Sequence, residues 1–129
     1  MGTTSPDDLA TVLWSLKSED YCYLTTIGRV SGNPHEIEIW FVVEGSTLYL
    51  LSGNHKSDWV RNLRVQPAVT VRIAKNVFEG SARIVSEEKE DLMARQGLAE
   101  KYQEWNDEKS LSEWARTALP VAIDMHRAE

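Results

Sequence analysis

The sequence contains one cysteine among its 129 residues and no long apolar run. Cys22 has no partner for an internal disulfide, a pattern typical of a reducing compartment, and we expect the protein to be cytoplasmic. The longest apolar stretch, near Ile37–Val43, is too short and too charged to span a bilayer. Residues 1–16 lack the basic start and the apolar run of a signal peptide. The sequence therefore predicts no integral membrane segment.

Positive charge is also scarce. Fourteen Lys and Arg stand against twenty Asp and Glu, which gives a net charge of −6 at pH 7. A chain this acidic is not expected to bind nucleic acid as its main partner. The balance is uneven, because residues 21–75 hold six Lys and Arg against four acids. A locally basic middle favours a small anionic ligand, although a bias of this size also arises by chance.

Several motifs of catalysis and binding are missing. His35, His55 and His126 show no metal-ligand spacing, and one cysteine cannot support a zinc site. There is no G-x-S-x-G, no G-x-G-x-x-G after a strand, and no Walker motif. The sequence therefore predicts no metal site and no nucleophilic serine of the hydrolase type.

Hydrophobic periodicity predicts helices alternating with short strands. A helix at 6–18 begins at Ser5-Pro6, and a short helix follows Ser57. Of the helices within 87–118, the first is expected to end near residue 105, and Ser110 and Glu113 predict a capping box in the last. The expected strands lie at 21–27, 36–43, 47–51, 69–73, 77–85 and 120–125. Closing about six strands into a barrel removes their exposed edges. We expect an α+β fold, a small antiparallel barrel with flanking helices, in one domain over residues 1–129.

Two loops carry candidate anion-binding groups. The loop 28–35 combines two glycines with Arg29, whose planar guanidinium suits a phosphate or carboxylate. The loop 52–57 opens a helix whose free amides attract anions. An ordinary hairpin turn and an ordinary capped helix remain alternatives for both. Asn62 is a poor helix former, and we expect it to tie down a neighbouring loop or a cofactor.

The segment 25–34, T-T-I-G-R-V-S-G-N-P, resembles the T-T-x-G-R-x-S-G-x-P signature of the deazaflavin-dependent nitroreductase family. The segment 58–71 resembles that family's second block, W-x-x-N-L-x-x-x-P-x-V-x-V, and residues 119–123 are similar to its last strand. The resemblance implies a split β-barrel of the FMN-binding type, related to pyridoxamine-phosphate oxidases. It also implies coenzyme F420, an 8-hydroxy-5-deazaflavin, as the cofactor.

The resemblance assigns cofactor-binding roles to residues in both loops and on the strand between them. The first loop would grip the phosphate and the acidic tail, and the second loop with its helix would complete an anion site beside the ring. Strand residues would line the ring slot. The residues are Arg29, Ser31, Gly32, Pro34, His35, Ile37, Ile39, Trp40, Ser52, Gly53, His55, Lys56, Ser57, Trp59, Arg61 and Asn62.

Two positions depart from the family pattern. Val30 stands where the family usually has a lysine or arginine, and His35 stands where it often has an arginine. Each replacement removes positive charge near the expected acidic tail, although Lys56 and Arg61 offer compensation. FMN, with one phosphate and no glutamate tail, needs fewer cations and is the alternative cofactor.

The implied activity is an F420H2-dependent reductase that passes a hydride to a quinone, a nitro compound or an activated enone. Tyr102 is the expected catalytic proton donor, and Tyr23 is a weaker candidate. An FMN-binding oxidoreductase and a non-enzymatic carrier of a cofactor or ligand are the alternatives. The expected partner is a small-molecule redox substrate, with monomer and homodimer both open.

Overall fold

The computed structural model describes residues 6–129, and Ser5, the expected helix cap, lies outside them. Their elements are α1 (Pro6–Ser15), β1 (Cys22–Ile27), β2 (Pro34–Ile39), β3 (Val42–Glu44), β4 (Thr47–Ser52), α2 (Asp58–Val65), β5 (Ala68–Ile73), β6 (Asn76–Ile84), α3 (Glu88–Gln103), α4 (Glu113–Thr117) and β7 (Leu119–Ala128). No helix among the described residues is long and apolar enough to cross a membrane.

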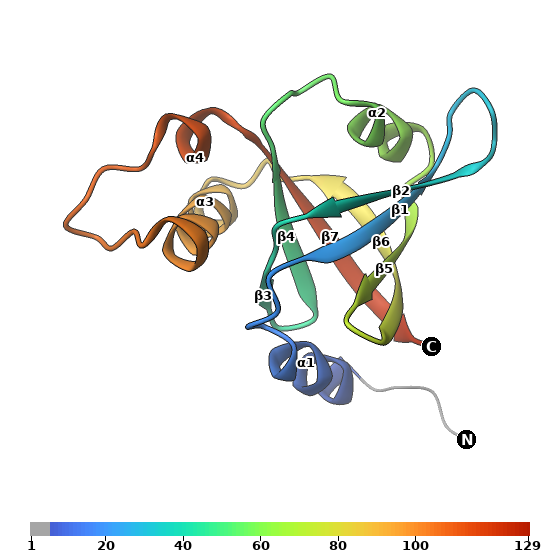
Figure 1. The fold of residues 1–129 in the computed structure, drawn as a ribbon, viewed down its shortest axis with the longest axis horizontal. Helices are drawn as coiled ribbons and strands as arrows, with labels where there is room; N and C mark the ends of the chain where they lie inside the picture. The colour runs from blue at the N-terminus through green and yellow to red at the C-terminus, as the bar shows by residue number, and fades with distance from the viewer. Residues whose placement is uncertain (1–5) are drawn as a thin grey trace.

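The strands form one curled antiparallel sheet in the order β2-β1-β5-β6-β7-β4-β3. β2 and β3 lie at opposite ends of this order, yet only Trp40 and Phe41 join them in the chain. So short a connection spans at most about 11 Å, and the sheet therefore curls until its two edges approach each other (Figure 1). The predicted α+β split-barrel fold is confirmed.

The expected single strand at 36–43 is divided into β2 and β3, which raises the number of strands from the predicted six to seven in the described chain. The alternation of Ile37, Ile39 and Phe41 gives no sign of this break. At the break, Phe41 N–H donates to Tyr102 Oη (3.1 Å), and Lys101 Nζ donates to Phe41 O (2.9 Å). Side chains of α3 thus take the place of strand partners for the Phe41 peptide groups.

Two helices end earlier than predicted. α1 ends at Ser15 instead of residue 18, because Leu16 N–H bonds Leu13 O (3.0 Å) in the tighter i→i−3 pattern. α3 ends at Gln103 instead of near residue 105, because Glu104 adopts a left-handed φ of 54°. Both differences are local events at helix termini.

The last short helix has a different cap from the one predicted. Ser112, not Ser110, precedes α4, and its Oγ accepts from Ala115 N–H (3.1 Å). Ser112 Oγ also donates to Gln103 Oε1 of α3 (2.8 Å). This contact with α3 accompanies the later start of α4, at Glu113.

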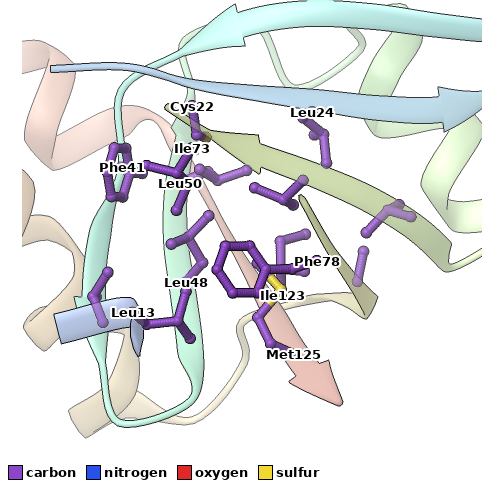
Figure 2. Close-up of a cluster of buried hydrophobic side chains, with 14 of the residues drawn as sticks. Leu13, Cys22, Leu24, Phe41, Leu48, Leu50, Ile73, Phe78, Ile123 and Met125 are labelled. Atoms are coloured by element: carbon purple, nitrogen blue, oxygen red, sulfur yellow. The ribbon is translucent and has the colours of Figure 1, made fainter. Parts of the chain in front are cut away.

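The core lies inside the curl of the sheet. Inward side chains alternate along β1, and β4 is buried on both faces because Tyr49 and Leu51 pack outward against α3. Figure 2 shows side chains of α1 and of several strands meeting, with Phe41 from the β2–β3 corner among them. The labelled residues are Leu13, Cys22, Leu24, Phe41, Leu48, Leu50, Ile73, Phe78, Ile123 and Met125.

The α2 helix covers one end of the sheet and positions the site described next. Val60 and Leu63 are buried on its inner face, and Asn62 is buried between them and the β1–β2 hairpin. Figure 1 shows α2 beside this hairpin, whereas α3 and α4 lie on the other side of the molecule.

Candidate cofactor site

A pocket with a volume of about 510 Å³ lies between the β1–β2 hairpin and α2. This volume falls within the range of small-molecule sites. The hairpin contributes Thr26, residues 28–31 and residues 35–37, and α2 contributes Asp58, Trp59 and Asn62. The two segments that resemble the family motifs are therefore the two walls of one pocket.

The Asn62 amide joins these walls. Its side chain is 3% exposed, and its Oδ1 accepts from the backbone N–H of Arg29 (3.1 Å) and from Arg29 Nη1 (2.9 Å). Its Nδ2 donates to Oγ1 of the buried Thr26 (3.2 Å). The expectation that Asn62 ties down a neighbouring loop is met by this geometry. The amide fixes both the hairpin backbone and the Arg29 side chain at the pocket.

The hairpin loop has a compact shape that depends on glycine. Gly28 N–H donates to Asn33 O (2.8 Å), and Gly32, at a φ of +74°, donates its N–H to Gly28 O (2.9 Å). A Cβ at Gly28 would lie 2.6 Å from Ser31 Oγ and 2.7 Å from His35 Nε2. These two side-chain atoms lie 3.3 Å apart. Glycine at position 28 therefore lets Ser31 and His35 meet at the pocket wall.

The polar groups of the loop suit an anion. Arg29 directs its guanidinium to the pocket, and within the described chain no hydrogen bond reaches the amides of Val30 and Ser31. Adjacent free amides in a turn form an anion-binding concavity. Val30 itself is 93% exposed. The donor set fits a phosphate or carboxylate group.

The apolar part of the lining suits a flat ring. Ile37 and Trp59 line the pocket and also pack against the main core, so their positions are supported from behind. A ring placed against them would lie close to the anion-binding loop. The pocket thus fits a ligand that combines an aromatic ring with an acidic group, as a flavin or deazaflavin nucleotide does.

Negative charge accompanies the positive charge in this pocket. Arg29 Nη2 lies 3.2 Å from Asp58 Oδ1, and Glu36 lies 3.6 Å from Arg72 of β5. The described lining therefore contains the guanidinium of Arg29 together with the carboxylates of Asp58 and Glu36. Within the described residues, no group of three or more His, Cys, Asp or Glu could hold a metal ion.

The second predicted loop turns toward α4 and does not line this pocket. Ser52 Oγ is buried and donates to Asn54 O (2.6 Å), and His55 Nε2 lies 2.8 Å from Thr117 O. Gly53 packs near Trp114. Ser57 precedes α2 as expected, but its side chain makes no capping hydrogen bond to the helix and lies 3.1 Å from Ser52 Oγ instead.

The remaining predicted residues divide between the hairpin, the core and the surface. Gly32 and Pro34 shape the hairpin outside the pocket lining, and Ile39 packs against the core. Lys56 and Arg61 are exposed on the chain leading into and along α2. Six predicted residues line the pocket: Arg29, Ser31, His35, Ile37, Trp59 and Asn62.

Trp40 and Tyr102 lie together on the α3 side of the molecule. Their rings are stacked with centroids 4.4 Å apart, and Trp114 meets Trp40 edge-on at 5.4 Å. The Tyr102 hydroxyl lies 2.8 Å from Asp20 O and 3.1 Å from Phe41 O, and burial raises the pKa of Tyr102 to about 12. Neither residue belongs to the described pocket lining. The proton-donor role of Tyr102 stays a prediction.

The weaker donor candidate, Tyr23, is bound to a carboxylate. Its hydroxyl donates to Glu38 Oε2 (2.9 Å), and this hydrogen bond raises the pKa of Tyr23. The sequence reasoning did not assign Thr26 or Asp58 to the site. The signal for Thr26 was a hydroxyl on the inward face of β1, between apolar neighbours. Asp58 lies in the first turn of α2, where a carboxylate is also favoured by the helix dipole, so its residue type alone did not indicate the pocket.

Comparisons with known proteins agree with this geometry. A family model described as F420H(2)-dependent quinone reductase matches residues 7–126. A conserved hypothetical protein from Mycobacterium tuberculosis has a similar structure, with a TM-score of 0.77 and 25% sequence identity, over 92% of this chain and 81% of that one.

Two further solved structures share the fold. An F420-H2 dependent reductase has a TM-score of 0.63 and 19% identity, over 81% of this chain and 93% of that one. A proposed pyridoxamine 5′-phosphate oxidase from Listeria innocua has a TM-score of 0.71 and 19% identity, over 94% and 95% of the two chains. At these identities the likeness concerns the fold alone.

Proposed function

The chain belongs to the F420H(2)-dependent quinone reductase family, and on that premise we propose that it reduces a small electron-poor acceptor with reduced coenzyme F420. Quinones, nitro compounds and activated enones are the acceptors that we propose. When bound, the coenzyme supplies a hydride from C5 of its deazaflavin ring. The protein's own contribution is to bind the ring, orient it and exclude water.

The observation that supports this proposal most is the set of hydrogen bonds by which the Asn62 amide joins α2 to Arg29 of the hairpin. It holds the Arg29 guanidinium where the two family-like segments meet. In our proposal, Arg29 and the amides of Val30 and Ser31 bind the coenzyme phosphate. Ile37 and Trp59 contact one face of the ring and keep water from it.

The other predicted residues take supporting roles in this proposal. Ser31 and His35 add hydrogen-bonding groups at the same wall. Lys56 and Arg61 are exposed cations near α2 and are proposed to attract the acidic tail. Gly32 and Pro34 shape the hairpin, and the loop 52–57 with Trp40 supports the neighbouring aromatic cluster.

Equilibrium titration with F420 tests the proposal. The change Arg29→Ala should weaken F420 binding by roughly 10- to 150-fold, because a charge-assisted hydrogen bond contributes about 1.5–3 kcal/mol. The matched control is Arg127→Ala, which removes the same charge from an exposed ion pair with Glu79 outside the pocket lining. Equal affinities for the two variants would contradict the proposed site.

FMN is the second candidate cofactor. The small number of cations in the pocket lining favours a ligand with little negative charge. Arg29 is the one arginine in the described lining, and two carboxylates accompany it. One phosphate without a glutamate tail would suit such a pocket. A flavin spectrum in the purified protein, with FMN binding tighter than F420, would select this alternative.

A carrier function is separated from a reductase function by turnover. Protein that binds reduced F420 but oxidises it no faster than buffer, with quinone, nitro and enone acceptors, would be a carrier. The cytoplasmic location, the single domain and the choice between monomer and homodimer stay predictions.

A further inference from the structure

Arg29, the cation of the proposed phosphate site, faces a carboxylate of its own chain. Its Nη2 lies 3.2 Å from Asp58 Oδ1 at the N-terminal end of α2, and both residues line the pocket. The Arg29 side chain is 26% exposed, whereas the Asp58 side chain is 86% exposed. The arginine is thus held in the wall, and the carboxylate reaches it from the solvent side.

The two ends of the Arg29 guanidinium are held by different kinds of partner. Nη1 donates to the buried amide of Asn62, which also receives the Arg29 backbone N–H. Within the described chain, Nη2 meets only the exposed carboxylate of Asp58. Releasing Asp58 would therefore leave the position of Arg29 fixed by Asn62.

The other titratable groups around the pocket do not compete for this nitrogen. Glu36 of β2 pairs with Arg72 of β5 at 3.6 Å. His35 of β2 lies against Ser31 Oγ at 3.3 Å. A phosphate that approaches Nη2 would meet Asp58 first, and two anions cannot share that position without repulsion.

We propose that Asp58 is a specificity-determining residue that acts as an internal counter-anion: it occupies Arg29 Nη2 and lowers the affinity of the pocket for anionic ligands. A ligand phosphate must displace the Asp58 carboxylate before it can bind Arg29 Nη2. This inference rests on the proposed function, since it concerns the same pocket and the phosphate of its coenzyme. It assigns Asp58 a negative contribution to affinity, opposite to that of Arg29.

The test compares a ligand that carries the phosphate with one that has the same ring and no phosphate. F420 and the deazaflavin riboside, which lacks the phosphate and the glutamates, are titrated against wild type and Asp58→Asn. The variant should bind F420 about three- to tenfold more tightly, as expected for one exposed charge interaction removed at this distance. Its affinity for the riboside should stay within about twofold of wild type.

The control is Glu79→Gln, which also raises the net charge by one and also breaks an exposed ion pair, with Arg127. It should leave both affinities unchanged. A gain in F420 affinity of the same size in Glu79→Gln would show an effect of net charge and would overturn the role of Asp58. A weaker F420 complex in Asp58→Asn would make Asp58 a positioning residue for Arg29, which also overturns the proposal.

A double variant tests whether Asp58 acts through Arg29. In the Arg29→Ala background, the change Asp58→Asn should give a smaller gain in F420 affinity than it gives in wild type. An equal gain would mean that Asp58 repels the ligand without occupying Arg29, against the proposal. Because Asp58 is mostly exposed, the variant is expected to keep its fold, which thermal unfolding checks.

Failure of the proposed function gives a different result. Wild-type protein that binds FMN and not F420 would refute the proposed coenzyme, and FMN with riboflavin would then test Asp58 in the same way. Wild-type protein that binds neither coenzyme would refute both proposals. F420 binding that does not respond to Asp58→Asn would refute the counter-anion role and leave the reductase proposal standing.

Discussion

Replacing Asn62 with leucine tests whether one buried amide holds the site together. Leucine has the same branched arrangement of side-chain heavy atoms as asparagine but can neither accept from Arg29 nor donate to Thr26. The change therefore removes three hydrogen bonds: to the Arg29 backbone, to the Arg29 guanidinium and to the Thr26 hydroxyl. Thr26 is fully buried, so water does not replace its lost partner in the folded protein.

The expected cost follows from the kinds of bond that are lost. Each of the two neutral hydrogen bonds contributes about 1 kcal/mol, and the bond to the guanidinium contributes about 1.5–3 kcal/mol when shielded. Arg29 is 26% exposed, so solvent recovers part of the charged contribution. We expect the free energy of unfolding to fall by about 2–4 kcal/mol.

Urea unfolding at neutral pH, followed by tryptophan fluorescence, measures this change. The control is Asn106→Leu, because the Asn106 amide is exposed and, among residues 6–129, bonds only the nearby Glu108 N–H (3.0 Å). The control should lose less than about 1 kcal/mol. F420 affinity should fall in Asn62→Leu and not in the control. A stability loss for Asn62→Leu no larger than that of the control would refute the claim that the Asn62 amide holds the hairpin and α2 together.

Three further predictions concern the hairpin, the sheet and the aromatic cluster. Gly28→Ala should lower stability by about 1–3 kcal/mol and weaken F420 binding, since its Cβ would lie 2.6 Å from a hairpin side chain; unfolding and titration measure both. The ion pair with Arg83 lowers the pKa of Glu90 from 4.5 to about 2, so its stabilisation is present above pH 4.5. Wild type should lose stability relative to Glu90→Gln as the pH falls from about 4.5 to 2, and a constant difference would contradict the pairing. Tyr102→Phe should lower stability by about 1–2 kcal/mol, because Phe41 N–H loses its acceptor. A fall in turnover with stability and F420 binding unchanged would instead support the proton-donor role.

Local sequence patterns predicted most of the helices and strands, because these elements depend mainly on residues that are close together along the chain. The alternation along β1 and the turn residues between strands suffice for the hairpins. The break at Phe41 could not be read from the sequence in this way. It depends on Lys101 and Tyr102, which lie about sixty positions later in the chain and bond the Phe41 peptide groups.

The candidate site was predicted in part for a similar reason. Arg29 and Asn62 were identified from their residue types, and their meeting across 33 positions required the folded structure. His55 and Gly53 looked like an anion-binding loop but face Thr117 and Trp114 near α4. Charged and small residues in a loop suit a ligand and a neighbouring helix equally well, and only tertiary contacts decide between them.

The most direct test of the account is a parallel titration of the purified protein with F420 and FMN under the same conditions. A family-typical reductase with the phosphate site at Arg29 should bind F420 more tightly than FMN, and Arg29→Ala should weaken F420 binding by at least tenfold. Tighter binding of FMN, or F420 binding that is unaffected by Arg29→Ala, would contradict it.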